Sequence, residues 1–340
     1  MRTLVISDLH LGGDLRRDVL REDPALEALL AALDGVDRLV LLGDVVELLD
    51  AHPPEAMAAA EPVLRAIGSR VGGDREVVVV PGNHDAALVR DWVGPHTSLA
   101  ADAPVPLDAT ALLGQLSAFL EPARVRVHYP GVWLAEGVWA THGHYLDRHL
   151  LPAAAYGVAR GLLGRLPQDG ATPLDYERAG GPSVTRIEAR LNRRLPRSLA
   201  PLVDDMLEFL RAATMPASPK SAVGNRFARA MALVLGAQMR RASIPALARV
   251  VHRLGLDAGW ALFGHVHRCG PLPGDEPRQW QGPGGRPRIL NTGSWVYEPL
   301  LVHHTTPPHP YWPGGAVLLE PGRDPRAIGL LDHLGADALH

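Results

Sequence analysis

The stretch EVVVVPGNHDAALV, residues 76–89, joins a buried strand to a polar turn. Its four consecutive valines, Val77–Val80, are typical of a strand that is covered on both faces. The run ends at Pro81-Gly82, and the chain then presents Asn83, His84 and Asp85. Pro, Gly and Asn are ordinary turn residues, so a solvated turn explains this stretch taken alone. A functional site is the alternative, because open α/β sheets carry their chemistry at the carboxyl ends of their strands.

The segments before this stretch alternate between strand and helix patterns. Short apolar runs at residues 3–7, 37–44 and 75–80 predict three buried strands. Residues 23–36 and 53–71 separate these runs and have helical periodicity, and the second segment begins with proline. The order strand, helix, strand, helix, strand predicts a parallel sheet with helices packed on it.

Strand patterns return later in the chain, before and after a long segment that has a helical pattern. Residues 123–144 predict two or three strands joined by glycine turns, and four more strands are predicted at residues 260–267, 287–295, 315–321 and 327–334. Between them, Ala, Leu and Arg dominate at helical spacing. We therefore predict a core domain of residues 1–150 and 256–340, interrupted by a helical cap insertion of residues 151–255.

The composition excludes several classes of protein. A chain of 340 residues with 46% hydrophobic and 21% charged residues is typical of a globular protein. The single cysteine, Cys269, excludes an internal disulfide framework. No apolar run is long enough for a signal peptide or a transmembrane helix. We therefore expect a cytoplasmic protein without a transmembrane segment, with peripheral contact to a membrane as an alternative.

The net charge of -3 hides an uneven distribution. Residues 151–255 contain sixteen Lys/Arg and seven Asp/Glu, whereas the rest of the chain contains eighteen and thirty. A basic helical face is either a solvated surface or a rim that attracts anionic substrates or anionic lipid. On the second interpretation, Arg190 and Arg194 contact the substrate.

Five of the predicted strands end in Asp, Asn or His. The five ends are SDLH (7–10), LGDVVE (42–47), PGNHD (81–85), ATHGH (140–144) and FGHVH (263–267). Each end taken alone fits a turn or a solvated histidine. Because the carboxyl ends of strands in one open sheet meet at the same edge, we expect these side chains to converge. Such a mixture of carboxylate, imidazole and amide ligands suits Mn, Fe, Co, Ni or Zn, and the seven candidate ligands are enough for two ions that share a carboxylate.

In this order, the motifs Asp-x-His, Gly-Asp, Gly-Asn-His-Asp, Thr-His-Gly and Gly-His-x-His resemble those of the calcineurin-like metallophosphoesterases. The resemblance covers residues 1–145 and 258–320. It implies an α/β fold of two packed mixed β-sheets flanked by helices, the four-layer αββα arrangement, with the insertion added. It also implies two metal sites that share Asp44, one with Asp8, His10 and His267, the other with Asn83, His142 and His265.

The resemblance implies hydrolysis of phosphoester or pyrophosphate bonds. In this family two divalent cations, for which we expect Mn with Fe, Zn, Co or Ni as alternatives, activate a bridging hydroxide that attacks phosphorus. His84 follows the predicted ligand Asn83 and is predicted to be the general acid. Glu47, three residues after the bridging Asp44, is predicted to orient His84. Asp85 is expected to cap the loop instead.

We expect an anionic phosphoester as the substrate, and nucleotide-linked and lipid-linked esters are candidates. The Gly-Asp motif continues as Val-Val-Glu-Leu, which differs from the Asp-Arg-Gly of protein phosphatases. The insertion lies between His142 and His265, a position that resembles the helical lid of bacterial UDP-diacylglucosamine pyrophosphohydrolases. His144 and Asn291 are further candidate substrate contacts, although His144 could instead support a ligand and Asn291 could belong to a tight turn.

Two other functions remain open at this point. A nucleic-acid-processing phosphodiesterase or nuclease would suit the basic insertion, but this segment lacks the aromatic residues that stack single-stranded bases. A metal-binding protein without turnover is the second alternative, although none of the seven predicted ligands is missing.

Overall fold

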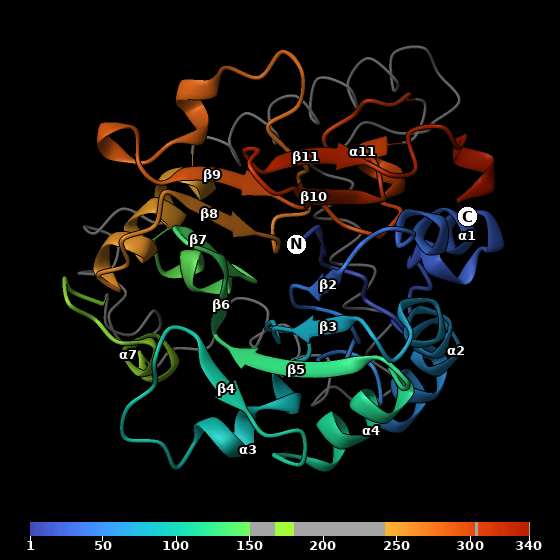
Figure 1. Ribbon diagram of the computed structural model, residues 1–340, viewed down its shortest axis with the longest axis horizontal. Helices are drawn as coiled ribbons and strands as arrows, with labels where there is room; N and C mark the ends of the chain where they lie inside the picture. Colours follow the sequence, from blue (N-terminus) through green and yellow to red (C-terminus); the bar gives the residue numbers. More distant parts are fainter. Residues whose placement is uncertain (150–166, 180–241, 303–304, 340) are drawn as a thin grey trace, which may run out of the picture.

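The computed structural model describes residues 1–149, 167–179, 242–302 and 305–339, and two β-sheets form its centre (Figure 1). The larger sheet contains, in spatial order, β11 (Arg326–Gly329), β10 (Gly315–Leu319), β1 (Thr3–Ile6), β2 (Arg38–Leu41), β3 (Glu76–Val79), β5 (Arg124–Tyr129) and β4 (Ala103–Val105). The smaller sheet contains β6 (Gly131–Ala135), β7 (Val138–Thr141), β8 (Trp260–Phe263) and β9 (Arg288–Asn291). Both sheets are mixed, as the sequence resemblance implied.

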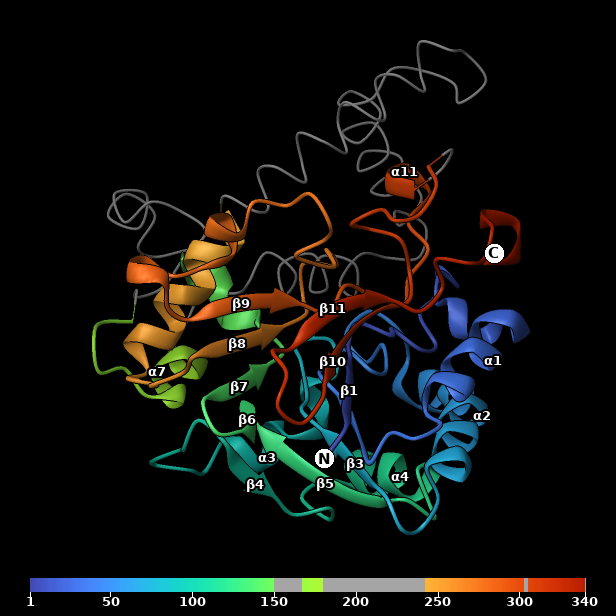
Figure 2. The same cartoon turned by 45° about the horizontal axis from the view of Figure 1, so that its top comes forward.

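Helices cover the outer face of each sheet. Figure 1 shows α1 (Asp23–Ala32), α2 (Pro53–Val71) and α4 (Ala111–Phe119) beside β2, β3 and β5. On the far side, α7 (Pro173–Arg178) and a helical stretch at 242–253, gold in Figure 2, lie beside the smaller sheet. Two further short helices are α3 (Arg90–Val93) and α11 (Pro299–Val302). None of the helices in the described ranges is long and apolar enough to cross a membrane.

The strand sequences explain the layers, because their alternate residues enter different cores. In β1, Leu4 and Ile6 pack with the helices on the outer face, while Val5 packs between the two sheets. In β8, Phe263 faces the outer core and Leu262 faces the core between the sheets. A strand that is apolar on both faces therefore reads as a continuous hydrophobic run, as the first three strands do.

The strand pairing brings the predicted ligands to one edge of each sheet. β1, β2, β3 and β5 are mutually parallel, and so are β7, β8 and β9. Register pairs Val5 with Val40, and Val40 with Val78. The polar ends of these strands therefore lie side by side, which confirms the predicted parallel arrangement.

Two described parts of the predicted insertion pack on the smaller sheet. Tyr176 of the 167–179 segment, and Ile244 and Leu247 of the 242–253 helix, share a buried cluster with Trp139 and Phe263. The rest of the predicted helical cap, residues 150–166 and 180–241, lies outside the described residues. The two basic residues predicted to contact substrate, Arg190 and Arg194, lie outside them as well.

Candidate active site

The loops that leave β1, β2 and β8 turn into the site through an uncommon backbone conformation. Six non-glycine residues in the described ranges have a positive φ. Five of the six are predicted metal ligands, with φ between 45° and 66°: Asp8, His10, Asp44, His265 and His267. Such conformations cost free energy and persist where the surrounding structure imposes them, which is common at functional sites. The sixth such residue is Arg16.

Backbone N–H groups from neighbouring loops orient the two aspartates. The amide of His84 donates to Asp44 Oδ1 at 2.8 Å, and the amide of His265 donates to Asp8 Oδ1 at 3.1 Å. Asp8 and Asp44 are 0% and 1% exposed. Burial raises the pKa of each carboxyl group, but the histidines around it, His142 above all, outweigh burial and lower the pKa. Both aspartates are therefore ionised, as metal ligands must be.

His142 provides a direct test of whether a cation fits here. Its Nδ1 donates to the carbonyl of Leu42 at 3.0 Å, so Nε2 is the atom that faces the site. That Nε2 lies 3.1 Å from Asp44 Oδ2 and 3.1 Å from Asn83 Oδ1. Three lone-pair atoms so close together repel one another unless a proton or a metal ion lies among them. Burial lowers the pKa of His142, but the charge of Asp44 outweighs it and raises the pKa to about 10.

His10 supports the same conclusion on the other side of Asp44. Its Nε2 is buried and has no hydrogen-bond partner. This atom lies 3.8 Å from Asp44 Oδ2 and 4.0 Å from Asp8 Oδ1, and His267 Nε2 lies 3.3 Å from Asp8 Oδ1. Buried polar atoms are rarely left unpaired, so this arrangement fits a divalent cation.

Glu47 holds two histidines at once. Its Oε2 lies 2.9 Å from His10 Nδ1 and 2.7 Å from His84 Nδ1, and its Oε1 accepts hydrogen bonds from the amides of Leu49 and Asp50. Burial raises the pKa of Glu47, but the hydrogen bonds from His10 and His84 lower it to about 2. An ionised carboxylate only accepts hydrogen bonds, so both Nδ1 atoms carry protons. Sequence reasoning predicted the contact with His84 and missed the contact with His10.

Two acidic residues that sequence reasoning missed also contact site histidines. Asp147 Oδ1 lies 2.9 Å from His265 Nε2, which leaves His265 Nδ1 for a metal ion. Glu177 of α7 accepts hydrogen bonds from the hydroxyls of Tyr129 and Tyr145 and lies 3.9 Å from His144 Nε2. Neither acid belongs to a sequence motif, because folding alone brings it to the site.

The remaining predicted residues separate into two groups. His144 is at the site, with its ring centroid 5.7 Å from that of His142. Asn291 is not available to a substrate, because its side chain is 0% exposed, donates to the Gly264 carbonyl and accepts from the Gly293 amide. The substrate contact predicted for Asn291 is therefore wrong, and the tight turn is the correct interpretation. Asp85 is buried and accepts hydrogen bonds from the amides of Val45 and Gly82, as a loop cap does.

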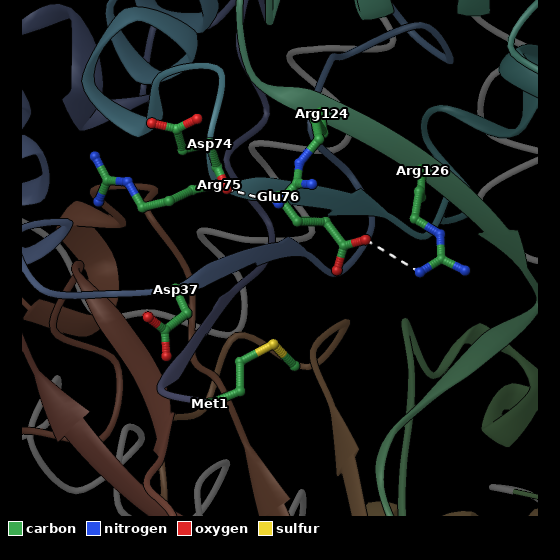
Figure 3. Close-up of a pocket in the computed structure, with 7 residues that line it drawn as sticks. All are labelled: Met1, Asp37, Asp74, Arg75, Glu76, Arg124 and Arg126. Atoms are coloured by element: carbon green, nitrogen blue, oxygen red, sulfur yellow. Dashed lines mark hydrogen bonds and ion pairs between the residues drawn. The ribbon is translucent and has the colours of Figure 1, made fainter.

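A cavity of about 350 Å³ opens over these side chains. His10, Asp44, Asn83, His84, His265 and His267 contribute to its wall. A larger hollow, about 540 Å³, lies at the opposite ends of the strands and is drawn in Figure 3. Its lining consists of Met1 and of acidic and basic residues such as Glu76 and Arg126, which pair with each other at 3.1 Å. With no histidine in its wall, that hollow lacks the ligand set of the first cavity.

Comparison with known proteins shows a family likeness in the first part of the chain. A search of curated proteins found no match. One similar solved structure is a cold-active protein-tyrosine phosphatase of a psychrophile, Shewanella sp., with 14% identity, a TM-score of 0.30, and coverage of 95% of this chain and 76% of that chain. A mutant of a cold-active protein tyrosine phosphatase has 15% identity, a TM-score of 0.32, and coverage of 98% and 78%. Likenesses this low carry no argument about substrate.

The family model described as calcineurin-like phosphoesterase matches residues 1–156. Over these residues the chain is similar to the calcineurin-like phosphoesterases, which are metal-dependent hydrolases of phosphoric esters.

Proposed function

We propose that this protein hydrolyses phosphoester or pyrophosphate bonds with two divalent metal ions. The observation that carries the proposal is the position of Asp44 between two groups of ligand atoms. His10 lies on one side of this carboxylate, and His142 and His265 lie on the other. A carboxylate shared in this way suits two ions better than one.

The residues divide between the two ions as follows. Asp8, His10 and His267 form a compact group of ligand atoms and hold the first ion. Asn83, His142 and His265 would hold the second, and Asp44 would be the ligand that the two sites share. Divalent ions bound there would supply Lewis acidity toward the phosphoryl oxygens and would lower the pKa of water to provide a nucleophile near neutral pH. Manganese as the native ion belongs to the same proposal and rests on the ligand chemistry.

His84 supplies the proton that the leaving oxygen needs. Burial lowers its pKa, but the charges of Asp44 and Glu47 outweigh burial and raise the pKa to about 9. Glu47 occupies its Nδ1, so Nε2 is the atom that is free to donate toward the cavity. A protonated imidazole fixed at the wall of the cavity acts as a general acid.

Selection of an anionic substrate by the insertion, residues 151–255, is part of the proposal. The contacts of Glu177 with Tyr129 and Tyr145 support only a position of the described segment 167–179 beside His144, and the preference for an anion rests on the sequence. Two parts of the proposal rest on the sequence alone. They are a substrate that is nucleotide-linked or lipid-linked, and a cytoplasmic location.

The proposal is tested with purified protein that is first stripped of metal and then titrated with Mn²⁺. Metal content measured by mass spectrometry should reach two ions per chain. Hydrolysis of bis(p-nitrophenyl) phosphate should appear with the metal, and a screen of nucleotides, sugar nucleotides and phospholipids then ranks the substrates. One ion at saturation would contradict the dinuclear assignment, and two ions without turnover on any phosphoester would favour a metal-binding protein.

A further inference from the structure

Arg16 lies in the loop that follows His10 and differs from the other arginines near the site. It shares its positive φ, 51°, with five predicted ligands and with no other non-glycine residue in the described ranges. Arginine has no intrinsic preference for this conformation, which costs roughly 1–3 kcal/mol. The contacts of the surrounding loop must therefore impose this backbone conformation on Arg16.

Backbone hydrogen bonds and one ion pair hold the loop, residues 12–18, in place. The Arg16 amide donates to the Gly13 carbonyl at 2.9 Å, and the Gly12 amide donates to Asp18 Oδ2 at 3.2 Å. Arg17 Nη1 donates to Glu298 Oε2 at 2.8 Å, and the Arg17 carbonyl accepts from the Tyr297 amide at 2.8 Å. The backbone of Arg16 is therefore held in place before any substrate binds.

The charge of Arg16 faces the cavity without an internal partner. Arg16 and Arg17 both line the cavity above the predicted ligands. Arg17 is paired with Glu298, whereas Arg16 has no ion pair or hydrogen bond from its guanidinium among the described residues. Asp14 and Asp50 also line the cavity, so its rim is not simply basic, and a guanidinium at this point of the rim favours a substrate whose negative charge lies beside it.

We propose that Arg16 is a specificity-determining residue that binds a second phosphate of the substrate, separate from the phosphorus that is hydrolysed. The inference rests on the proposed function. The reacting phosphoryl group must lie beside the ions that Asp8, Asp44 and His142 would hold, and these residues are almost fully buried, whereas Arg16 is exposed at the rim. A planar guanidinium binds a phosphate through two parallel hydrogen bonds, so pyrophosphate-linked esters fit this geometry.

The test measures binding of two probes by calorimetry, at a fixed excess of free Mn²⁺. Methylenediphosphonate carries two phosphonate groups, and orthophosphate carries one phosphorus. Arg16→Gln should weaken binding of methylenediphosphonate about tenfold, which corresponds to about 1.4 kcal/mol for a charged hydrogen bond at a partly exposed site. The same variant should change orthophosphate binding less than about threefold. Arg16→Lys should fall between the two proteins, because a lysine provides the charge without the paired donors.

Arg278→Gln is the matched control, because Arg278 is exposed and does not line the cavity. Equal losses for both probes in Arg16→Gln would place Arg16 on the reacting phosphoryl group and overturn the inference. Unchanged binding of both probes would overturn it as well. The proposed function is judged separately, by hydrolysis of bis(p-nitrophenyl) phosphate by the unmodified protein. A protein that hydrolyses this ester but binds methylenediphosphonate no differently after Arg16→Gln refutes only the role of Arg16.

Discussion

Replacing Glu47 with glutamine tests whether one carboxylate organises both the metal ligand and the acid. In the native chain, Oε2 accepts from His10 Nδ1 and His84 Nδ1, while Oε1 accepts from two backbone amides. The amide oxygen of glutamine can keep the backbone bonds, so its NH₂ group must face the two histidines. Donor then meets donor, and each Nδ1 has to give up its proton or its partner.

The size of the effect follows from these bonds. Each hydrogen bond to a charged group contributes about 1.5–3 kcal/mol, and part of the loss is recovered as the rings move. A net loss of about 2–3 kcal/mol corresponds to a change of about 30- to 150-fold. If His10 responds by moving its proton to Nε2, the atom that faces the metal loses its lone pair. Glu47→Gln should therefore bind the first of the two ions about 30- to 150-fold more weakly.

The assay is a Mn²⁺ titration followed by metal analysis, together with turnover of an alkyl and a nitrophenyl phosphoester. The titration of Glu47→Gln should become biphasic, and turnover of the alkyl ester should fall further than turnover of the nitrophenyl ester. Glu55→Gln is the control, since the side chain of Glu55 is 84% exposed. If Glu47→Gln titrates as the native protein does and hydrolyses the alkyl ester at the native rate, the proposed roles of this carboxylate are wrong.

Three further predictions concern residues beside Glu47. Asp44→Asn should lose most of its metal and at least about a hundredfold in turnover, and two retained ions with near-native activity would contradict its shared position. His84→Ala should retain both ions and lose about 10²–10⁴-fold on an alkyl ester, with a smaller loss on a nitrophenyl ester; loss of metal would make His84 a ligand. Gly82→Ala should weaken metal binding, because its methyl group would meet Asp44 Oδ1 and lie 2.7 Å from His142 Cδ2. Native metal content in a folded Gly82→Ala protein would show that the loop can move away.

The fold was predictable where single strands are apolar on both faces. The runs around Val5, Val40 and Val78 are buried between a sheet and its helices on one side and the second sheet on the other, so each shows up as an uninterrupted hydrophobic segment. Several short elements escaped prediction, among them β4 and α4. β4 has only three residues and contains Pro104, and α4 contains Gly114 near its centre, so neither has a strong periodic signal. Strand order was also out of reach, because β10 pairs with β1 across most of the chain.

The site was predictable where the ligands belong to motifs at strand ends. Asp8 and Asp44 follow the parallel neighbours β1 and β2, so one sheet edge brings them together as expected. His142 follows β7 of the smaller sheet, and its Nε2 reaches Asp44 because the two sheets pack together. Asp147 and Glu177 could not be found this way, since each approaches a histidine from a helical segment whose position depends on tertiary packing. Asn291 is the opposite case, because it belongs to a motif but not to the site. Its motif looked functional, but the polar groups of its side chain are fully used in holding the Gly264 loop.

The pairing of β7 with β8 bears on which part of the chain can be replaced while the fold is kept. The two strands are neighbours in the smaller sheet, yet Thr141 and Trp260 are separated by more than a hundred residues of sequence. Everything between them leaves the sheet at the carboxyl end of β7 and returns at the amino end of β8, because Trp260 pairs with Val138, the first residue of β7. No strand pair among the described residues involves this segment, so exchanging part of it need not disturb one. Tyr176 and Ile244, which are anchored in the outer core, mark where such an exchange must stop. A chimaera that replaces only residues 180–241 with the corresponding segment of another phosphoesterase should therefore keep its metal chemistry while acquiring a new substrate range.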